Sequence, residues 1–148
     1  MTAVVGGTVR PSFGDVEVGT PLPEHVQVVV RQDLVRYAAA SGDLNTIHWD
    51  EATARAAGLP DVIAHGMYTM GVAGAALTAW AGAGAVRGYR TRFARPVVVP
   101  RGDEGATIVV TGRVAAKLDA PAVRVDLEVR CGADKVLTRT SAIVELGP

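Results

Sequence analysis

Hydrophobic and polar residues alternate along the second half of the chain. In residues 123–130 every second position is Val or Leu, and the positions between them are Arg, Asp or Glu. Residues 107–114 follow a similar pattern. This period of two is typical of strands with one face in water. Two more long strands are expected at Tyr89–Val99 and Val136–Glu145, and a short one at His25–Val30.

The first half of the chain predicts helices. After an irregular segment rich in Gly and Pro at Phe13–Pro23, helices are expected at Arg31–Ala40, Asp50–Ala57 and Met67–Ala81. Asp50 is a good N-cap for the second helix. The strands of the second half follow one another with short turns and no helices between them, so the sheet they form should be antiparallel.

The segment of residues 66–86 carries no charged side chain. Its length is close to that of a membrane span, but five glycines and many alanines make transfer into lipid unfavourable, so no membrane insertion is expected. A helix of this kind is better placed against the apolar face of a sheet. We therefore predict an α+β fold, in which a curved antiparallel sheet curls around one long, buried central helix. The small residues of that helix would allow close packing, or leave room for a ligand tunnel.

Composition limits the possible functions. The 148 residues fit one domain, expected at residues 13–148 after a loose tail at residues 1–12. Lys and Arg together number 15, and so do Asp and Glu together, so the net charge is zero and no nucleic-acid partner is expected. The single cysteine, Cys131, cannot form an intrachain disulfide, which fits a reducing, cytoplasmic setting. The three histidines show no tight ligand spacing, so no metal site is predicted.

The loop predicted between the first two helices is dense in chemical groups. Asp43 and His48 lie five residues apart across a non-helical turn, which can fold so that both side chains face one cavity. A carboxylate and an imidazole together can take a proton from one atom and give one to another near neutral pH. Asn45, between them, can hold a water or a hydroxyl. Alternatively, Asp43 and Asn45 cap turns and His48 is a satisfied, half-buried side chain.

A second cluster lies at the start of the long helix. Backbone N–H groups at His65, Gly66 and Met67, supported by the helix dipole, can stabilise negative charge that develops on a carbonyl oxygen. Gly66 lacks a side chain, so a substrate oxygen can approach its amide closely. A simple junction between turn and helix, with His65 supporting the turn, explains the same residues.

Together the two clusters resemble a known family. The string SGDLNTIHWD at residues 41–50, followed by GLPDVIAHGMYTMG at residues 58–71, resembles the MaoC-like (R)-specific enoyl-CoA hydratases and (3R)-hydroxyacyl carrier-protein dehydratases. The resemblance extends from about Phe13 to Leu146. Within the family the chain looks closest to the catalytic beta subunit of the dehydratase of mycolic-acid chain elongation. One departure is Thr46, where the family usually has proline.

The resemblance implies a hot-dog fold and reversible hydration of an acyl thioester. It implies that Asp43, Asn45 and His48 form the catalytic loop, and that Gly66, with its neighbours His65 and Met67, binds the thioester oxygen. No cofactor is implied, because coenzyme A or a carrier-protein phosphopantetheine arm is part of the substrate. The family also implies pairing of two hot-dog units, as a homodimer or as a heterodimer with a second hot-dog subunit.

Two other kinds of hot-dog protein, and two roles for a group of arginines, are alternatives. A hot-dog thioesterase would need a carboxylate placed at the carbonyl rather than at C3, and a non-catalytic acyl-binding subunit would be expected to lack Asp43 and His48. Either class is a possible alternative to the hydratase. The phosphates of the carrier could bind the arginines near the strand after the long helix, or these side chains could form a solvated face: Arg90, Arg92, Arg95 and Arg101.

Overall fold

The computed structural model describes residues 10–148, so residues 1–9 of the predicted tail lie outside it. Ser12 forms a bridge to Gly147 near the other end of the chain, and a short 3-10 helix follows at Phe13–Asp15. None of the helices in the described part combines the length and apolarity that crossing a membrane requires.

Five strands form one antiparallel sheet in the order β1-β3-β4-β5-β2. Each strand is antiparallel to the neighbours with which it is hydrogen-bonded. The bounds are β1 at His25–Val29, β2 at Val86–Phe93, β3 at Ala106–Lys117, β4 at Ala122–Cys131 and β5 at Asp134–Glu145. All the predicted strands are therefore present, and β2 and β1 form the two edges.

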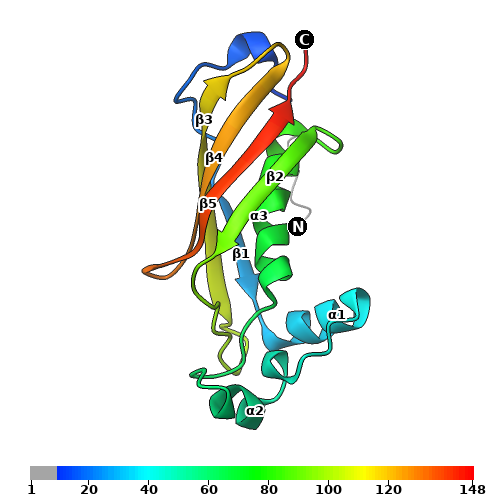
Figure 1. Cartoon of the computed structure of the whole chain (residues 1–148), viewed down its shortest axis with the longest axis vertical. Coiled ribbons are helices and arrows are strands. Elements are labelled where there is room, and N and C mark those ends of the chain that lie inside the picture. The colour runs from blue at the N-terminus through cyan, green and yellow to red at the C-terminus, as the bar shows by residue number, and fades with distance from the viewer. Residues whose placement is uncertain (1–9) are drawn as a thin grey trace, which may run out of the picture.

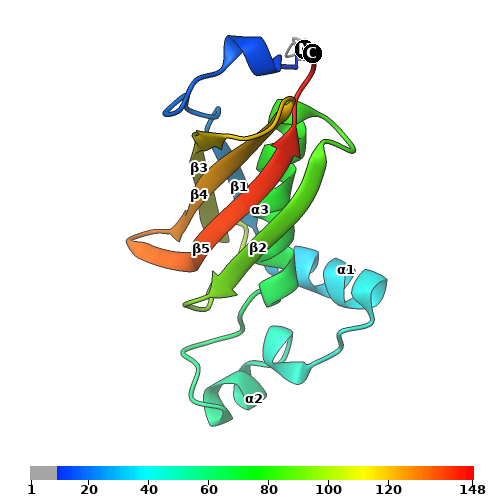
Figure 2. The same cartoon turned by 45° about the horizontal axis from the view of Figure 1, so that its top comes forward.

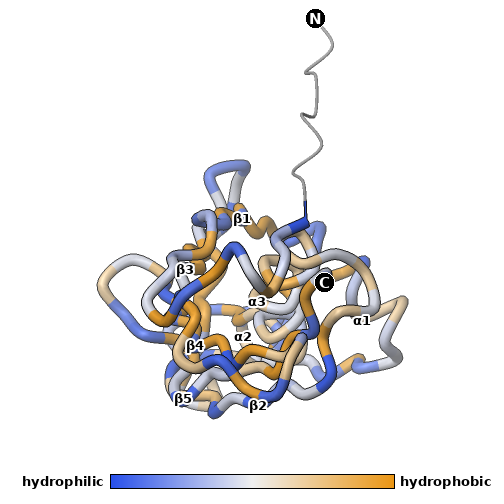
Figure 3. The backbone as a smooth tube through the Cα atoms, turned by 90° about the horizontal axis from the view of Figure 1, so that it is seen from above, coloured by the Kyte–Doolittle hydropathy of each residue, from blue (hydrophilic) through white to orange (hydrophobic). Residues whose placement is uncertain are grey.

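The long helix α3, Gly66–Ala81, lies along the concave side of the sheet (Figures 1 and 2). Viewed from above, the strands curve around it (Figure 3), and it contacts β1, β2, β3 and β5. The core forms because alternate residues of the strands, such as Ile108 and Val125, are buried together with Ala73 and Leu77 of the helix. The predicted fold class is confirmed.

The packing of α3 differs in one respect from the prediction of a helix buried all round. Ala73 is buried, whereas Met67, Gly71 and Ala75 on another side of the helix are exposed. Close packing holds on the side of β2: a Cβ at Gly74 would lie 3.4 Å from Cε1 of Tyr89, whose hydroxyl donates to the Met70 carbonyl at 2.7 Å.

The two short helices lie together beyond one end of α3, away from the body of the sheet (Figures 1 and 2). Helix α1 spans Arg31–Ser41 and helix α2 spans Glu51–Ala56. Asp50 caps α2 as predicted, by accepting from the amides of Ala52 and Thr53. These helices position the loop that carries the candidate catalytic residues.

The predicted strand Tyr89–Val99 was wrong at both ends. Strand β2 begins at Val86 and ends at Phe93, after which the chain leaves the sheet. The departing segment forms a bridge between Val98 and Ile63, in the connection between α2 and α3. Val97 and Val99 are buried there, and the backbone of residues 97–99 pairs with this connection and not with a strand of the sheet.

Candidate active site

The loop between α1 and α2 is shaped by its own side chains. Gly42 ends α1 in the left-handed region, at a φ of 77°, which favours glycine. The Asp43 carboxylate then accepts from the Asn45 amide at 3.2 Å, and the Asn45 side-chain oxygen accepts from the Ile47 amide at 3.3 Å. These two turns lead into a 3-10 helix at Thr46–His48. The turn-capping role considered for Asp43 and Asn45 is therefore real, and it places His48.

His48 is buried and its ring is oriented by one strong contact. Its Nδ1 lies 2.7 Å from the carbonyl oxygen of Ile63. Because a carbonyl can only accept, Nδ1 carries the hydrogen in this geometry, and Nε2 is left as a free acceptor. Nε2 lies 4.0 Å from Oδ2 of Asp43, whose carboxylate is half exposed. This separation is too long for a direct hydrogen bond, but both atoms can reach a small group placed between them.

His65 contacts both catalytic candidates, Asp43 and His48. Its ring is buried and stacks on the ring of His48, with centroids 3.8 Å apart and planes at 23°. Its Nε2 donates to the Asp43 carbonyl at 3.1 Å. Burial lowers the pKa of His65 below its usual 6.5, which favours the neutral ring. The support expected from His65 is thus directed at Asp43 and His48 more than at the turn into α3.

Helix α3 begins at Gly66, directly beside these rings. The first backbone bond of the helix runs from the Thr69 amide to the His65 carbonyl at 3.2 Å. The amides of the residues before Thr69, Gly66 among them, have no acceptor one helical turn earlier, as at any helix start. The ring of Phe93 lies over this point, because a Cβ built on Gly66 would be 3.1 Å from its Cε1 atom. The absence of a side chain at Gly66 therefore leaves room for the ring of Phe93.

A cavity of about 360 Å³ opens between the loop, the start of α3 and the end of β2. His48 and Gly66 both line it, together with buried Thr69 and apolar side chains of β5. A mostly apolar wall with a few polar groups suits an acyl group that carries one reactive carbonyl. The lining residues are Ile47, His48, Ile63, Ala64, Gly66, Thr69, Phe93, Ala94, Arg95, Pro96, Val97, Val136 and Leu137.

The structure brings most of the predicted site residues together. Asp43, His48, His65 and Gly66 meet at the helix tip. Met67 is 59% exposed and does not line the cavity.

Three residues that line the cavity are not predicted from the sequence: Thr69 on α3, and Val136 and Leu137 on β5. Residues of these types are common in any buried core, so they do not indicate a site. Strand β5 also follows the candidate catalytic loop by about ninety residues.

The four candidate phosphate-binding arginines have different surroundings. Arg101 pairs with Glu51, and Arg90 donates to the Ser141 hydroxyl at 3.2 Å. Arg95 lines the cavity and lies 3.9 Å from Asp134. Arg92 is exposed. Arg95 is therefore the only one of these four arginines that lines the cavity.

The same residues contain one possible set of metal ligands. One ligand atom from each of Asp43, His48 and His65 lies within 4.8 Å of the others. Ligands bound to one zinc at about 2.0–2.2 Å are closer together than this, so the side chains would have to move inward. Acid–base work by Asp43 and His48 requires no such movement.

Comparisons with known proteins agree with this geometry. The chain is 42% identical, over 80 residues, to 3-hydroxyacyl-thioester dehydratase X of Mycobacterium tuberculosis, which covers 54% of this chain and 28% of that relative. A solved MaoC-like dehydratase has a TM-score of 0.89 and 41% identity, covering 93% of this chain and 43% of that one. The chain thus spans less than half the length of these two relatives.

A third relative is matched over most of both chains. The R-hydratase PhaJ1 from Pseudomonas aeruginosa has a TM-score of 0.80 and 30% identity, covering 93% of this chain and 86% of its own. These likenesses confirm the hot-dog fold. Residues 15–131 match the family described as the MaoC like domain. The chain therefore belongs to the MaoC-like domain family.

Proposed function

We propose that this chain catalyses the reversible hydration of a 2-enoyl thioester to a (3R)-3-hydroxyacyl thioester. The observation that carries the proposal is the placement of His48 Nε2 4.0 Å from Oδ2 of Asp43, with His48 and Gly66 lining one cavity. Two of the similar proteins, a 3-hydroxyacyl-thioester dehydratase and an R-hydratase, support it.

In the dehydration direction the first step is removal of a proton from C2. The thioester oxygen gains negative charge as this proton leaves, and the Gly66 amide at the positive end of α3 stabilises it. His48 takes the proton, because its Nδ1 already donates to Ile63 and its Nε2 is the free base.

The second step breaks the bond between C3 and its oxygen. The Asp43 carboxylate accepts a hydrogen bond from the 3-hydroxyl and so holds this group near Nε2 of His48. His48 returns its proton to the hydroxyl as the bond breaks, so water leaves and the enzyme regains its initial state. Asn45 keeps Asp43 and His48 in place through its turn and offers its amide NH₂ to the departing water.

The substrate carrier and the assembly are part of the same proposal. The carrier, coenzyme A or a carrier-protein arm, belongs to the substrate, and the chemistry uses no separate cofactor. The exposed edges β1 and β2 and the greater length of two relatives support pairing with a second hot-dog unit, from a copy of this chain or from another subunit. A cytoplasmic setting is proposed on the single cysteine.

An assay with crotonyl-CoA distinguishes the hydratase from the thioesterase and from the non-catalytic subunit. Loss of the enoyl absorbance without thiol release supports the hydratase, whereas thiol release at the rate of substrate loss indicates a thioesterase. If neither occurs with the purified chain, alone or with a second hot-dog subunit, the non-catalytic alternative is favoured and the proposal fails. Size-exclusion chromatography with light scattering measures the assembly in the same samples.

A further inference from the structure

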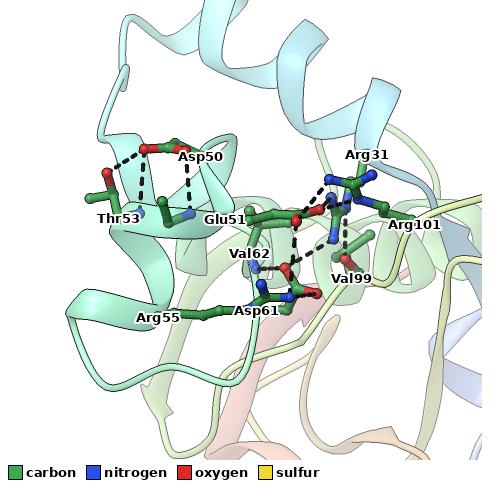
Figure 4. A network of polar contacts seen from close by, with 10 residues as sticks. Arg31, Asp50, Glu51, Thr53, Arg55, Asp61, Val62, Val99 and Arg101 are labelled. Carbon is green, nitrogen blue, oxygen red and sulfur yellow. Dashed lines mark hydrogen bonds and ion pairs between the residues drawn. The ribbon is translucent and has the colours of Figure 1, made fainter.

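An ion-pair cluster joins the start of α1, the start of α2 and the connection between α2 and α3 (Figure 4). In it the guanidinium groups of Arg31, Arg55 and Arg101 surround the carboxylates of Glu51 and Asp61. We call these five residues the arginine cluster. Its three arginines differ in burial: the side chain of Arg31 is 25% exposed, against 59% for Arg55 and 78% for Arg101. Arg31 is therefore the arginine of the cluster that is least screened by water.

Arg31 binds three segments that are far apart in the sequence. Its Nε donates to the Val99 carbonyl at 3.0 Å, its Nη1 donates to Glu51, and its Nη2 lies 3.0 Å from Oδ1 of Asp61. The first two contacts are hydrogen bonds and the third is an ion pair only, and a guanidinium can hold all three because its nitrogens are fixed in one plane. The ammonium of lysine is a single point charge and cannot reproduce all three contacts at once.

Two of these segments pair with each other beside His48. The amide of Ala64 donates to the Val97 carbonyl at 2.8 Å, and the amide of Val99 donates to the Val62 carbonyl at 3.0 Å. Ile63, in the middle of this pairing, provides the carbonyl that accepts from Nδ1 of His48. Ala64 and Val97 also line the cavity.

The contacts of Arg31 lie at one end of this pairing. Asp61 precedes Val62 and accepts from its amide at 2.8 Å, and Val99 is the last residue of the other segment. Arg31 therefore joins the two segments at the end of the pairing opposite Ala64 and Val97, which line the cavity. Through Glu51, the first residue of α2, Arg31 also fixes the point where the catalytic loop ends.

We propose that Arg31 is a positioning residue for His48, acting through the Ile63 carbonyl that orients the imidazole. This inference rests on the proposed hydration function, because it treats His48 as the base. Arg31 itself touches neither the cavity nor the reacting atoms. Its effect on the reaction is to keep Nδ1 of His48 bound to Ile63 and thereby to keep Nε2 free and aimed at the substrate.

The kinetic test compares Arg31→Met with a matched control, Arg101→Met. Arg101 binds the same carboxylate, Glu51, but its hydrogen bonds do not reach Asp61 or Val99. We expect Arg31→Met to lower kcat on crotonyl-CoA by about 10- to 100-fold with a small change in KM, because misplacing a catalytic group by about 1 Å has effects of this size. Arg101→Met should stay within about twofold of wild type, as expected for an exposed ion pair. Arg31→Lys should fall between the two.

A spectroscopic measurement separates positioning from simple loss of stability. In ¹⁵N-labelled protein the ring nitrogens of His48 report which of them carries the hydrogen, and His48→Ala assigns the signal among the three histidines. Wild type should show hydrogen on Nδ1. Arg31→Met should shift the ring toward a mixture of both neutral forms, whereas a purely structural role would lower the melting temperature and leave this signal unchanged.

The Arg31→Met variant should fold, because Arg101 still pairs with Glu51 and Arg55 still lies 3.6 Å from Asp61. If it does not fold, Asp61→Asn replaces it, since asparagine keeps the shape and the acceptor for the Val62 amide but weakens the contact with Arg31. A smaller loss of kcat with the same shift of the His48 signal is then expected.

The outcomes also separate this inference from the proposed function. Wild-type protein that does not hydrate crotonyl-CoA contradicts the proposed function, while the His48 signal still tests the role of Arg31. An unchanged His48 signal, in whichever of the two variants folds, would overturn the inference whatever the rate, and so would a wild-type kcat.

Discussion

Replacing Gly66 with alanine separates the role of this residue in the reaction from its role in folding. Gly66 is the first residue of α3 and lines the cavity. The new Cβ would lie 3.1 Å from Cε1 and 3.2 Å from Cδ1 of Phe93. These contacts are tight, but Phe93 is 57% exposed and its ring can move by a few tenths of an ångström. The methyl group then occupies the space through which a substrate oxygen reaches the amide.

The stability and activity of Gly66→Ala should therefore change by very different amounts. Alanine is favoured over glycine in a helix by about 0.5–1 kcal/mol, and the tight contact with Phe93 acts in the opposite direction. We expect a net change below about 1 kcal/mol, which is a shift of roughly 2–4 °C in Tm for a chain of this size. Blocking one donor to a developing oxyanion should lower kcat by about 100- to 1,000-fold, or about 2.7–4 kcal/mol.

The assay is hydration of crotonyl-CoA with thermal unfolding measured on the same sample. Gly71→Ala is the matched control, because Gly71 lies on the same helix and a Cβ there meets nothing within 4 Å. It should be as stable as wild type or slightly more so, and fully active. Gly66→Ala with kcat and KM equal to those of the control would refute the assignment of the helix-tip amide.

A double variant shows which of two mechanisms lowers the activity. If the methyl group acts by pushing the ring of Phe93 into the cavity, Gly66→Ala combined with Phe93→Ala should recover most of the rate lost on adding the methyl. If the methyl group blocks the amide directly, the rate should stay low. The Phe93→Ala single variant provides the reference rate.

Three further predictions follow from the same contacts. Asp43→Asn and His48→Ala should each lower hydration by at least about 100-fold with an unchanged circular dichroism spectrum, and wild-type rates would remove both from the mechanism. Burial lowers the pKa of His65, so near its usual value of 6.5 the unfolded chain binds a proton more readily than the folded chain. The urea concentration at the unfolding midpoint should therefore decrease as the pH is lowered from 7.5 to 5.5. The decrease should be smaller in His65→Gln. Hydrogen bonds from Arg101 and Arg31 lower the pKa of Glu51 to about 2. The ionised carboxylate of Glu51 therefore stabilises the fold above its usual pKa of 4.5, and this stabilisation is lost as the pH falls toward 2. The difference in unfolding free energy between wild type and Glu51→Gln should be largest at pH 7, and a pH-independent difference would contradict the ion pairs.

Local patterns predicted the elements well where local physics forms them. Alternation gave β3 and β4, and Asp50 gave the start of α2, because a period of two and an N-cap act over a few residues. Val30 precedes α1 and has no side-chain oxygen with which to cap the helix. In the structure the Asp33 carboxylate accepts from the Val30 amide at 3.0 Å, so the cap comes from inside the helix.

The predicted strand ending at Val99 shows where such patterns fail. Val97 and Val99 are buried and Val98 between them is not fully so, which is the alternation of a strand. Their backbone pairs with Val62–Ala64 and not with the sheet. An apolar side chain indicates that a position is buried, but it does not identify the partner that buries it.

The sequence by itself determined the types of residue available for chemistry and the order of the elements that carry them: an acid and an imidazole in a loop, a glycine at the start of an uncharged helix, and strands to cover that helix. The tertiary structure decided which ring nitrogen of His48 is free, what lies beneath its ring and which side chains wall the cavity. These depend on Ile63, His65 and Leu137, whose contacts with the catalytic loop form only after distant parts of the chain have packed together. Spacing along the chain does not specify such contacts, because they are fixed by the summed packing of the whole core.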